Sequence, residues 1–267
     1  MKEIGGYFEL ELASKEECHT SAIKLNSGRN AFKYILKAQN IKKIYIPNFI
    51  CNSIIDPLVE LSISYEFYNI DSNFEIIQEI DLLKDERILY VNYFALKSQY
   101  VKRLADKYQN NLIIDNTQDF FGKPLKNIDT IYSPRKFFGV SDGGYLYANH
   151  LLEGLLPCDE SYIHSVQLLG RADKEASLFY NEYKKAEQRL INQPIKKMSN
   201  LTNKILSSID YESIKQKRKE NFEYLHNELK EINLLENIDI KSTPFIYPFI
   251  TNDLQLREKL IKNNFRH

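Results

Sequence analysis

The sequence is poor in cysteine, with only Cys18, Cys51 and Cys158 among its 267 residues. The three lie far apart and none belongs to a Cys-x-x-Cys pair. Their odd number and wide spacing argue against a disulfide framework and against a zinc site. We therefore expect no bound metal and a reduced, cytoplasmic setting.

The chain also lacks an excess of charge of either sign. Lysine plus arginine number 36, aspartate plus glutamate number 36, and the formal net charge is +0. Without a broad positive field, nucleic acid is not an expected partner. Two basic clusters, at residues 196–197 and 215–219, are typical of solvated helix faces.

Long apolar runs are missing as well. No segment approaches the roughly 20 apolar residues that cross a bilayer, and the opening residues Met1 to Gly6 contain no apolar signal-peptide core. We therefore expect no membrane association. Hydrophobic residues make up 43% and charged residues 27%, which is ordinary for a globular protein. The length suits one large domain with an appendage, or two smaller domains.

Short runs rich in Ile, Tyr and Val alternate with helical patterns in the first part of the chain. Several runs are apolar without alternation, as in strands buried on both faces of a parallel sheet. The pattern predicts helices at residues 30–39 and 100–108. The predicted strands cover residues 44–46, 63–68, 88–92, 112–114, 130–132 and 145–148. This indicates a mostly parallel α/β sheet flanked by helices, with room for one antiparallel return between residues 132 and 145.

The texture changes beyond about residue 160, where charge rises and glycine becomes rare. The pattern there predicts helices at 174–190, 211–229 and 254–261, an apolar stripe at Leu201, Ile205 and Ile209, and a strand at 246–250. We therefore expect a large α/β domain at residues 1–160. Residues 161–267 would form a helical extension and part of a small α+β C-terminal domain.

Two predicted strands end in chemically active side chains. Asp115 directly follows an apolar run, and Lys136 follows the next one. Strand ends at the carboxyl edge of such a sheet are where ligands bind. A carboxylate there can pair with a protonated ring nitrogen, and a lysine can form an imine with an aldehyde. Taken singly, an aspartate that caps a turn and a surface lysine remain open alternatives.

Further polar groups are expected at the same edge. Ser27, Gly28 and Arg29 open the first predicted helix, whose free N–H groups and positive dipole end favour an anion such as phosphate. A plain helix cap explains the same residues equally well. Gln118 is placed to donate to a ring oxygen, and Gly143-Gly144 indicates a tight turn after Lys136.

The order of these motifs resembles that of fold-type-I enzymes dependent on pyridoxal phosphate (PLP). More narrowly, it resembles the DegT/StrS group of nucleotide-sugar aminotransferases, over roughly residues 20 to 150. The resemblance implies PLP as cofactor, with Lys136 as the lysine that binds it covalently and moves protons. It further implies that Asp115 pairs with the ring nitrogen, that Gln118 contacts the ring hydroxyl, and that the helix start at Ser27, Gly28 and Arg29 holds the phosphate.

Several positions depart from the family pattern. Arg29 stands where the family usually has threonine, and Ile131 stands where a phosphate-binding serine is common. Ser133 lies two residues later on the same strand face and is a substitute for that serine. Cys51 occupies the usual place of the ring-stacking aromatic; the nearby alternatives are Phe49, Tyr93 and Phe94. Family members are usually longer, so we expect a short or C-terminally truncated variant.

The resemblance implies an aminotransferase that acts on a nucleotide-linked keto-sugar by a ping-pong mechanism with an amino-acid donor. The product would be an amino sugar for surface glycans, and the enzyme would be a homodimer. Two other functions stay open. One is a non-catalytic protein or binding module that keeps the fold. The other is a different PLP reaction, such as sugar dehydration, in which histidine replaces the lysine; Lys136 argues against it.

Overall fold

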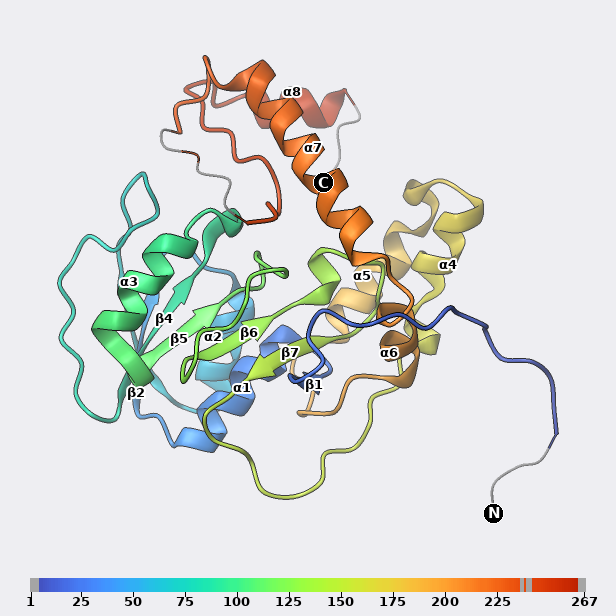
Figure 1. Cartoon of the computed structure of the whole chain (residues 1–267), viewed down its shortest axis with the longest axis horizontal. Helices are drawn as coiled ribbons and strands as arrows, with labels where there is room; N and C mark the ends of the chain where they lie inside the picture. Colours follow the sequence, from blue (N-terminus) through green and yellow to red (C-terminus); the bar gives the residue numbers. More distant parts are fainter. Residues whose placement is uncertain (1–4, 236–237, 239–241, 264–267) are drawn as a thin grey trace.

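The computed structural model describes residues 5–235, 238 and 242–263. Its centre is a sheet of seven strands in the order β1-β7-β6-β5-β4-β2-β3 (Figure 1). The strands are β1 (Ile23–Leu25), β2 (Lys43–Pro47), β3 (Ser64–Tyr68), β4 (Glu86–Val91), β5 (Leu112–Asp115), β6 (Asp129–Tyr132) and β7 (Gly144–Tyr147). The six predicted strands are confirmed to within about two residues, whereas the edge strand β1 was not predicted.

The sheet is mostly parallel. Strands β2 to β6 run parallel to their neighbours among themselves, while β7 runs antiparallel to both β6 and β1. Because β7 alone is reversed, the expected single antiparallel return is confirmed. In the register of the sheet, Asp115 lies between Val91 of β4 and Ile131 of β6. The carboxyl ends of these three parallel strands therefore meet at one edge.

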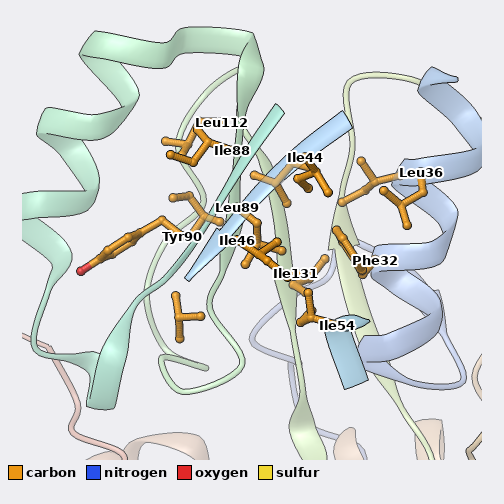
Figure 2. Packing of buried hydrophobic residues seen from close by; sticks show 14 of the residues in the cluster. Phe32, Leu36, Ile44, Ile46, Ile54, Ile88, Leu89, Tyr90, Leu112 and Ile131 are labelled. Carbon is orange, nitrogen blue, oxygen red and sulfur yellow. The ribbon is translucent and has the colours of Figure 1, made fainter. Parts of the chain in front are cut away.

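Helices cover both faces of the sheet. Figure 2 shows the sheet residues between α1 (Gly28–Gln39) on one side and α3 (Ser98–Tyr108) on the other. Phe32 of α1 and Ile44 of β2 are fully buried, and burying such a side chain contributes roughly 2 kcal/mol. The core thus holds α1 firmly against the sheet.

Beyond β7, the elements found in the described residues are helical. They are α4 (Val166–Asp173), α5 (Tyr180–Gln188), α6 (Asn200–Leu206), α7 (Tyr211–Leu229) and α8 (Leu256–Lys262), with short 3-10 turns between. The predicted helices at 211–229 and 254–261 are confirmed. None of the described helices combines the length and apolarity needed to cross a membrane.

Two predictions for this part differ from the structure. The helix expected at 174–190 is shorter: Lys174 has an extended backbone, a 3-10 turn covers Ala176–Phe179, and α5 begins at Tyr180 and ends at Gln188. The strand expected at 246–250 is irregular. There the Asn233 side chain donates to the Pro248 carbonyl and accepts from the Ile250 N–H, so it takes the backbone groups that a partner strand would use. The last four residues of the chain lie outside the described part.

A second, aromatic core contains a buried histidine. His19 is 3% exposed; its Nε2 lies 2.7 Å from the Phe120 carbonyl oxygen and its Nδ1 lies 3.1 Å from the Tyr147 hydroxyl. A carbonyl only accepts, so Nε2 carries the proton and Nδ1 accepts from Tyr147. Burial lowers the pKa of His19 from 6.5 to about 4.

This buried histidine predicts a loss of stability in mild acid. As the pH falls below 6.5, His19 is protonated in the unfolded chain but stays neutral in the folded chain. The free energy of unfolding therefore falls until about pH 4. Between pH 7 and pH 5 the loss is about 2 kcal/mol. Urea unfolding of wild type and His19→Gln should show a stability difference that shrinks by this amount. A difference that stays constant with pH would contradict the assignment, and His150→Gln, at an exposed histidine, is the control.

Candidate functional site

The loop after β5 is held by both neighbouring strands. Asp115, the last residue of β5, is 6% exposed. Its carbonyl accepts from the Asn92 N–H at 3.0 Å, and the next residue, Asn116, donates its N–H to the Ile131 carbonyl at 2.9 Å. The Asp115 carboxylate accepts from the Thr117 N–H at 2.8 Å. This carboxylate is therefore fixed at the edge of the sheet.

Thr117 connects Asp115 with Lys136. Lys136 ends the 3-10 turn Pro134–Lys136 that follows β6, and its Nζ donates to the Thr117 Oγ1 at 2.9 Å. The Thr117 N–H binds the Asp115 carboxylate at the same time. The structure thus brings together the two residues that the sequence singled out. Thr117 was missed, although it lies inside the Asp115-x-x-Gln118 motif.

The start of α1 reaches the same place. The Ser27 Oγ accepts from the Asn30 N–H at 3.1 Å and caps the helix. The N–H groups of Gly28 and Arg29 therefore remain at the positive end of α1, without a partner inside the helix. A Cβ atom on Gly28 would lie 3.5 Å from the Thr117 Cγ2 and 3.7 Å from the Ser133 Cβ. The helix start, the loop after β5 and the residue after β6 therefore converge.

The glycine turn after Lys136 fastens α1 in this position. The Gly143 N–H donates to the Asn26 carbonyl at 2.8 Å, and Gly143 has a φ of +124°, which favours glycine. A Cβ on Gly144 would lie 2.4 Å from the Ser27 carbonyl carbon and oxygen. Only glycine lets β7 approach the helix start so closely.

Two predicted residues are already engaged by the protein. The Gln118 Oε1 accepts from the Phe94 N–H at 2.8 Å, which leaves the amide NH₂ as a donor. The Arg29 guanidinium donates to the Leu190 carbonyl at 2.8 Å and pairs with Asp56 at 3.2 Å. The Arg29 side chain is thus committed to these contacts, while its backbone N–H stays at the helix start. Ser133 makes no side-chain capping bond to the turn that it precedes.

The candidates for the ring-stacking residue are placed as follows. Cys51 is exposed and precedes α2 (Asn52–Glu60). The rings of Phe49 and Tyr93 are stacked, with centroids 5.7 Å apart and an interplanar angle of 15°. The Tyr93 hydroxyl donates to the Phe49 carbonyl at 2.8 Å. Phe94 is partly buried and holds the contact to Gln118.

The loop after β5 contains a buried carboxyl group. Asp119 is 1% exposed, and burial raises its pKa from 3.8 to about 7. The Asn92 Nδ2 donates both to the Asp119 Oδ2 at 2.9 Å and to the Asn116 Oδ1 at 3.1 Å. This network ties the end of β4 to the loop after β5. The sequence did not single out Asn92 or Asp119, since neither belongs to the recognised motifs.

The comparisons with known proteins identify structural neighbours only. No protein-family model matches the sequence, and no curated protein matches it. NtdA from Bacillus subtilis, solved with the cofactor PMP, is 17% identical with a TM-score of 0.61, over 91% of this chain and 57% of that one. A DegT/DnrJ/EryC1/StrS aminotransferase from Brucella abortus is 14% identical with a TM-score of 0.54, over 91% and 69%.

A third structure, an E. coli GDP-4-keto-6-deoxy-D-mannose-3-dehydratase with bound hydrated PLP, is 15% identical with a TM-score of 0.53, over 91% and 70%. The chain spans 57% of the length of NtdA. The three likenesses show that it has the fold of the fold-type-I PLP-dependent aminotransferases. The resemblance to the DegT/StrS group that the motifs indicated is confirmed at the level of the fold.

The close approach at Gly144 predicts a matched pair of substitutions. Gly144→Ala drives a methyl group into the Ser27 backbone and should cost about 2 kcal/mol or more, since overpacking forces the backbone to shift. Gly139→Ala, where a Cβ meets only the Leu168 Cδ2 at 3.7 Å, should change stability by less than about 0.5 kcal/mol. Urea unfolding of both variants checks this. Equal effects would mean that the Gly144 contact does not hold α1 in place.

Proposed function

We propose that this protein is a PLP-dependent aminotransferase that acts on a nucleotide-linked keto-sugar. The observation that carries the proposal is the bridge made by Thr117 between the Asp115 carboxylate and the Lys136 amine. The start of α1 adds a place for an anion beside this bridge. PLP chemistry requires at least a carboxylate, a lysine and an anion site, and here all three lie at one edge of the sheet.

The residues present fit this cofactor. The N–H groups of Gly28 and Arg29, with the Ser133 side chain beside them, suit the phosphate, and the missing side chain of Gly28 keeps this place open. Asp115 suits the ring nitrogen, the Gln118 amide suits the ring hydroxyl, and Lys136 suits the aldehyde. When bound, PLP would supply the electron sink that amino-group transfer needs.

The chain's own groups would then act as follows. The Asp115 carboxylate, fixed by the Thr117 N–H, would keep the ring nitrogen protonated. The Thr117 hydroxyl would hold the Lys136 amine in place. The Lys136 Nζ would act first as a general base and then as a general acid. It would take a proton from the carbon that loses the amino group and deliver a proton to the carbon that receives it.

The sugar substrate of the proposal is supported by the neighbours. Their names include sugar aminotransferases and a dehydratase that acts on a GDP-linked keto-sugar, which supports a role in amino-sugar biosynthesis. We further propose an amino-acid donor in a ping-pong cycle, a cytoplasmic homodimer, a product for surface glycans, and the two-domain division at residue 160.

A non-catalytic protein with this fold is the second candidate. The Arg29 guanidinium is committed to Leu190 and Asp56, and Ile131 is fully buried in the core, so neither side chain offers a phosphate ligand. This candidate predicts a folded protein that leaves Lys136 unmodified by PLP. Sugar dehydration is disfavoured because the site has Lys136 in place of the histidine found in such enzymes.

Covalent attachment of PLP to Lys136 is the prediction that tests the proposed function. Protein incubated with PLP should show the visible absorbance of bound cofactor, and borohydride should fix the cofactor on the peptide containing Lys136. Lys136→Ala should lose at least about 90% of the absorbance, while Lys123→Ala, at an exposed lysine, should keep it. A folded wild-type protein that gains neither signal would favour the non-catalytic candidate.

A further inference from the structure

A segment from the end of the chain lies against the candidate lysine. The Phe245 ring centroid is 5.9 Å from the Lys136 Nζ and 5.3 Å from the ring of Phe137, the next residue along the chain. Thr243 and Pro244, which precede Phe245, are buried. In Figure 1 this segment comes down from the region of α7 and α8 to the end of β4. It belongs to the part of the chain predicted to form a helical extension and part of a small C-terminal domain, and it borders the site.

The backbone of this segment is attached to the turn after β4. The Ser242 hydroxyl donates to the Ala95 carbonyl, and the Phe245 N–H donates to the Phe94 carbonyl at 3.3 Å. Phe94 and Ala95 have φ values of +56° and +65°, a conformation that costs free energy in residues other than glycine. Gln118 holds the same turn through the Phe94 N–H. The turn is therefore held on one side by the loop after β5 and on the other by residues 242–245.

Arg218 of α7 attaches the other side of Phe245. Its Nη1 donates to the Phe245 carbonyl at 2.9 Å, and its guanidinium lies 4.5 Å from the centroid of the Phe137 ring. Burial lowers the pKa of Arg218, and within the described residues no carboxylate forms an ion pair with it. Among the described residues, the Phe245 carbonyl and the Phe137 ring are contacts that offset its desolvation.

These contacts close a circuit around the lysine. Gln118 binds the Phe94 N–H, and the Phe94 carbonyl accepts from the Phe245 N–H. The Phe245 carbonyl accepts from Arg218, whose guanidinium lies over the ring of Phe137. Phe137 follows Lys136, and the Lys136 amine donates to Thr117, the neighbour of Gln118. The Lys136 side chain is nevertheless exposed, so a carbonyl compound can reach its amine from the open side. The Phe245 ring, 5.9 Å from the Lys136 Nζ, borders this amine.

We propose that Phe245 limits the size of the carbonyl compound that reaches Lys136, and that Arg218 is a positioning residue that holds Phe245 there. The identity of the natural carbonyl compounds, a cofactor aldehyde and a keto-sugar, rests on the proposed function. The size limit set by Phe245 does not depend on that function. A pocket discriminates by what fits against its walls. Shortening the side chain at 245 therefore favours larger carbonyl compounds selectively.

The test uses two simple aldehydes, acetaldehyde and 2-naphthaldehyde, with cyanoborohydride and the whole protein. The Lys136 nitrogen adds to the carbonyl carbon, water leaves, and hydride from cyanoborohydride reduces the C=N bond to a stable secondary amine. Mass spectrometry of the peptides then gives the ratio of naphthyl to ethyl adduct on Lys136. The same ratio on the exposed Lys123 is the internal reference.

Relative to wild type, Phe245→Ala should raise the referenced ratio about tenfold, equivalent to about 1.4 kcal/mol of discrimination. Arg218→Ala should also raise the referenced ratio. Arg218→Lys keeps a hydrogen-bond donor, so its ratio should lie between those of Arg218→Ala and wild type. Tyr224→Ala, at an exposed aromatic of α7, should leave it unchanged. Phe245→Leu replaces Phe245→Ala if circular dichroism shows the alanine variant to be unfolded.

An unchanged ratio in a folded Phe245 variant would contradict the proposal that Phe245 limits the size of the carbonyl compound. Equal changes for Arg218→Ala and Arg218→Lys would overturn the positioning role of Arg218. Because neither aldehyde is a cofactor, these outcomes are independent of whether PLP binds. Failure of the proposed function would appear instead as an absence of PLP on Lys136 with the size discrimination intact.

Discussion

The close contact between the Gly143–Gly144 turn and the start of α1 is the constraint on which the site depends. A side chain at Gly144 would overlap the Ser27 backbone, so β7 can lie this near to α1 only without one. The contact places the start of α1 beside Ser133 and Thr117 at the carboxyl edge of the sheet. If the helix start moved, an anion held there would lose its alignment with Asp115 and Lys136.

The chemistry of the site follows from short chain segments that a parallel sheet gathers at one edge. Asp115 ends β5 and Lys136 ends the turn after β6, and the two strands are neighbours. Thr117 turns this proximity into a fixed relation, because its N–H and its hydroxyl reach both groups. Binding energy is best used when such groups are oriented before the ligand arrives.

Much of the fold could be predicted because its signals are local. Buried parallel strands appear as apolar runs, and α7 appears as a long amphipathic pattern. The edge strand β1 is too short, at 3 residues, to show a period. The strand expected at 246–250 failed because the Asn233 side chain, distant in sequence, takes its backbone groups.

The candidate site could be predicted only in part for the same reason. Asp115, Lys136 and Gly28 carry motif signals, whereas Thr117, Asn92 and Phe245 act through contacts that depend on the tertiary fold. The direction of the Arg29 side chain is set by Leu190 and Asp56, which come from two other segments. No local pattern indicates any of these partners.

A crystal structure of the protein with PLP tests the central claim most directly. We predict continuous density from the Lys136 Nζ to the cofactor, the ring nitrogen within hydrogen-bond distance of Asp115, and the phosphate at the N–H groups of Gly28 and Arg29 beside Ser133. A phosphate bound elsewhere, or a cofactor not joined to Lys136, would contradict it.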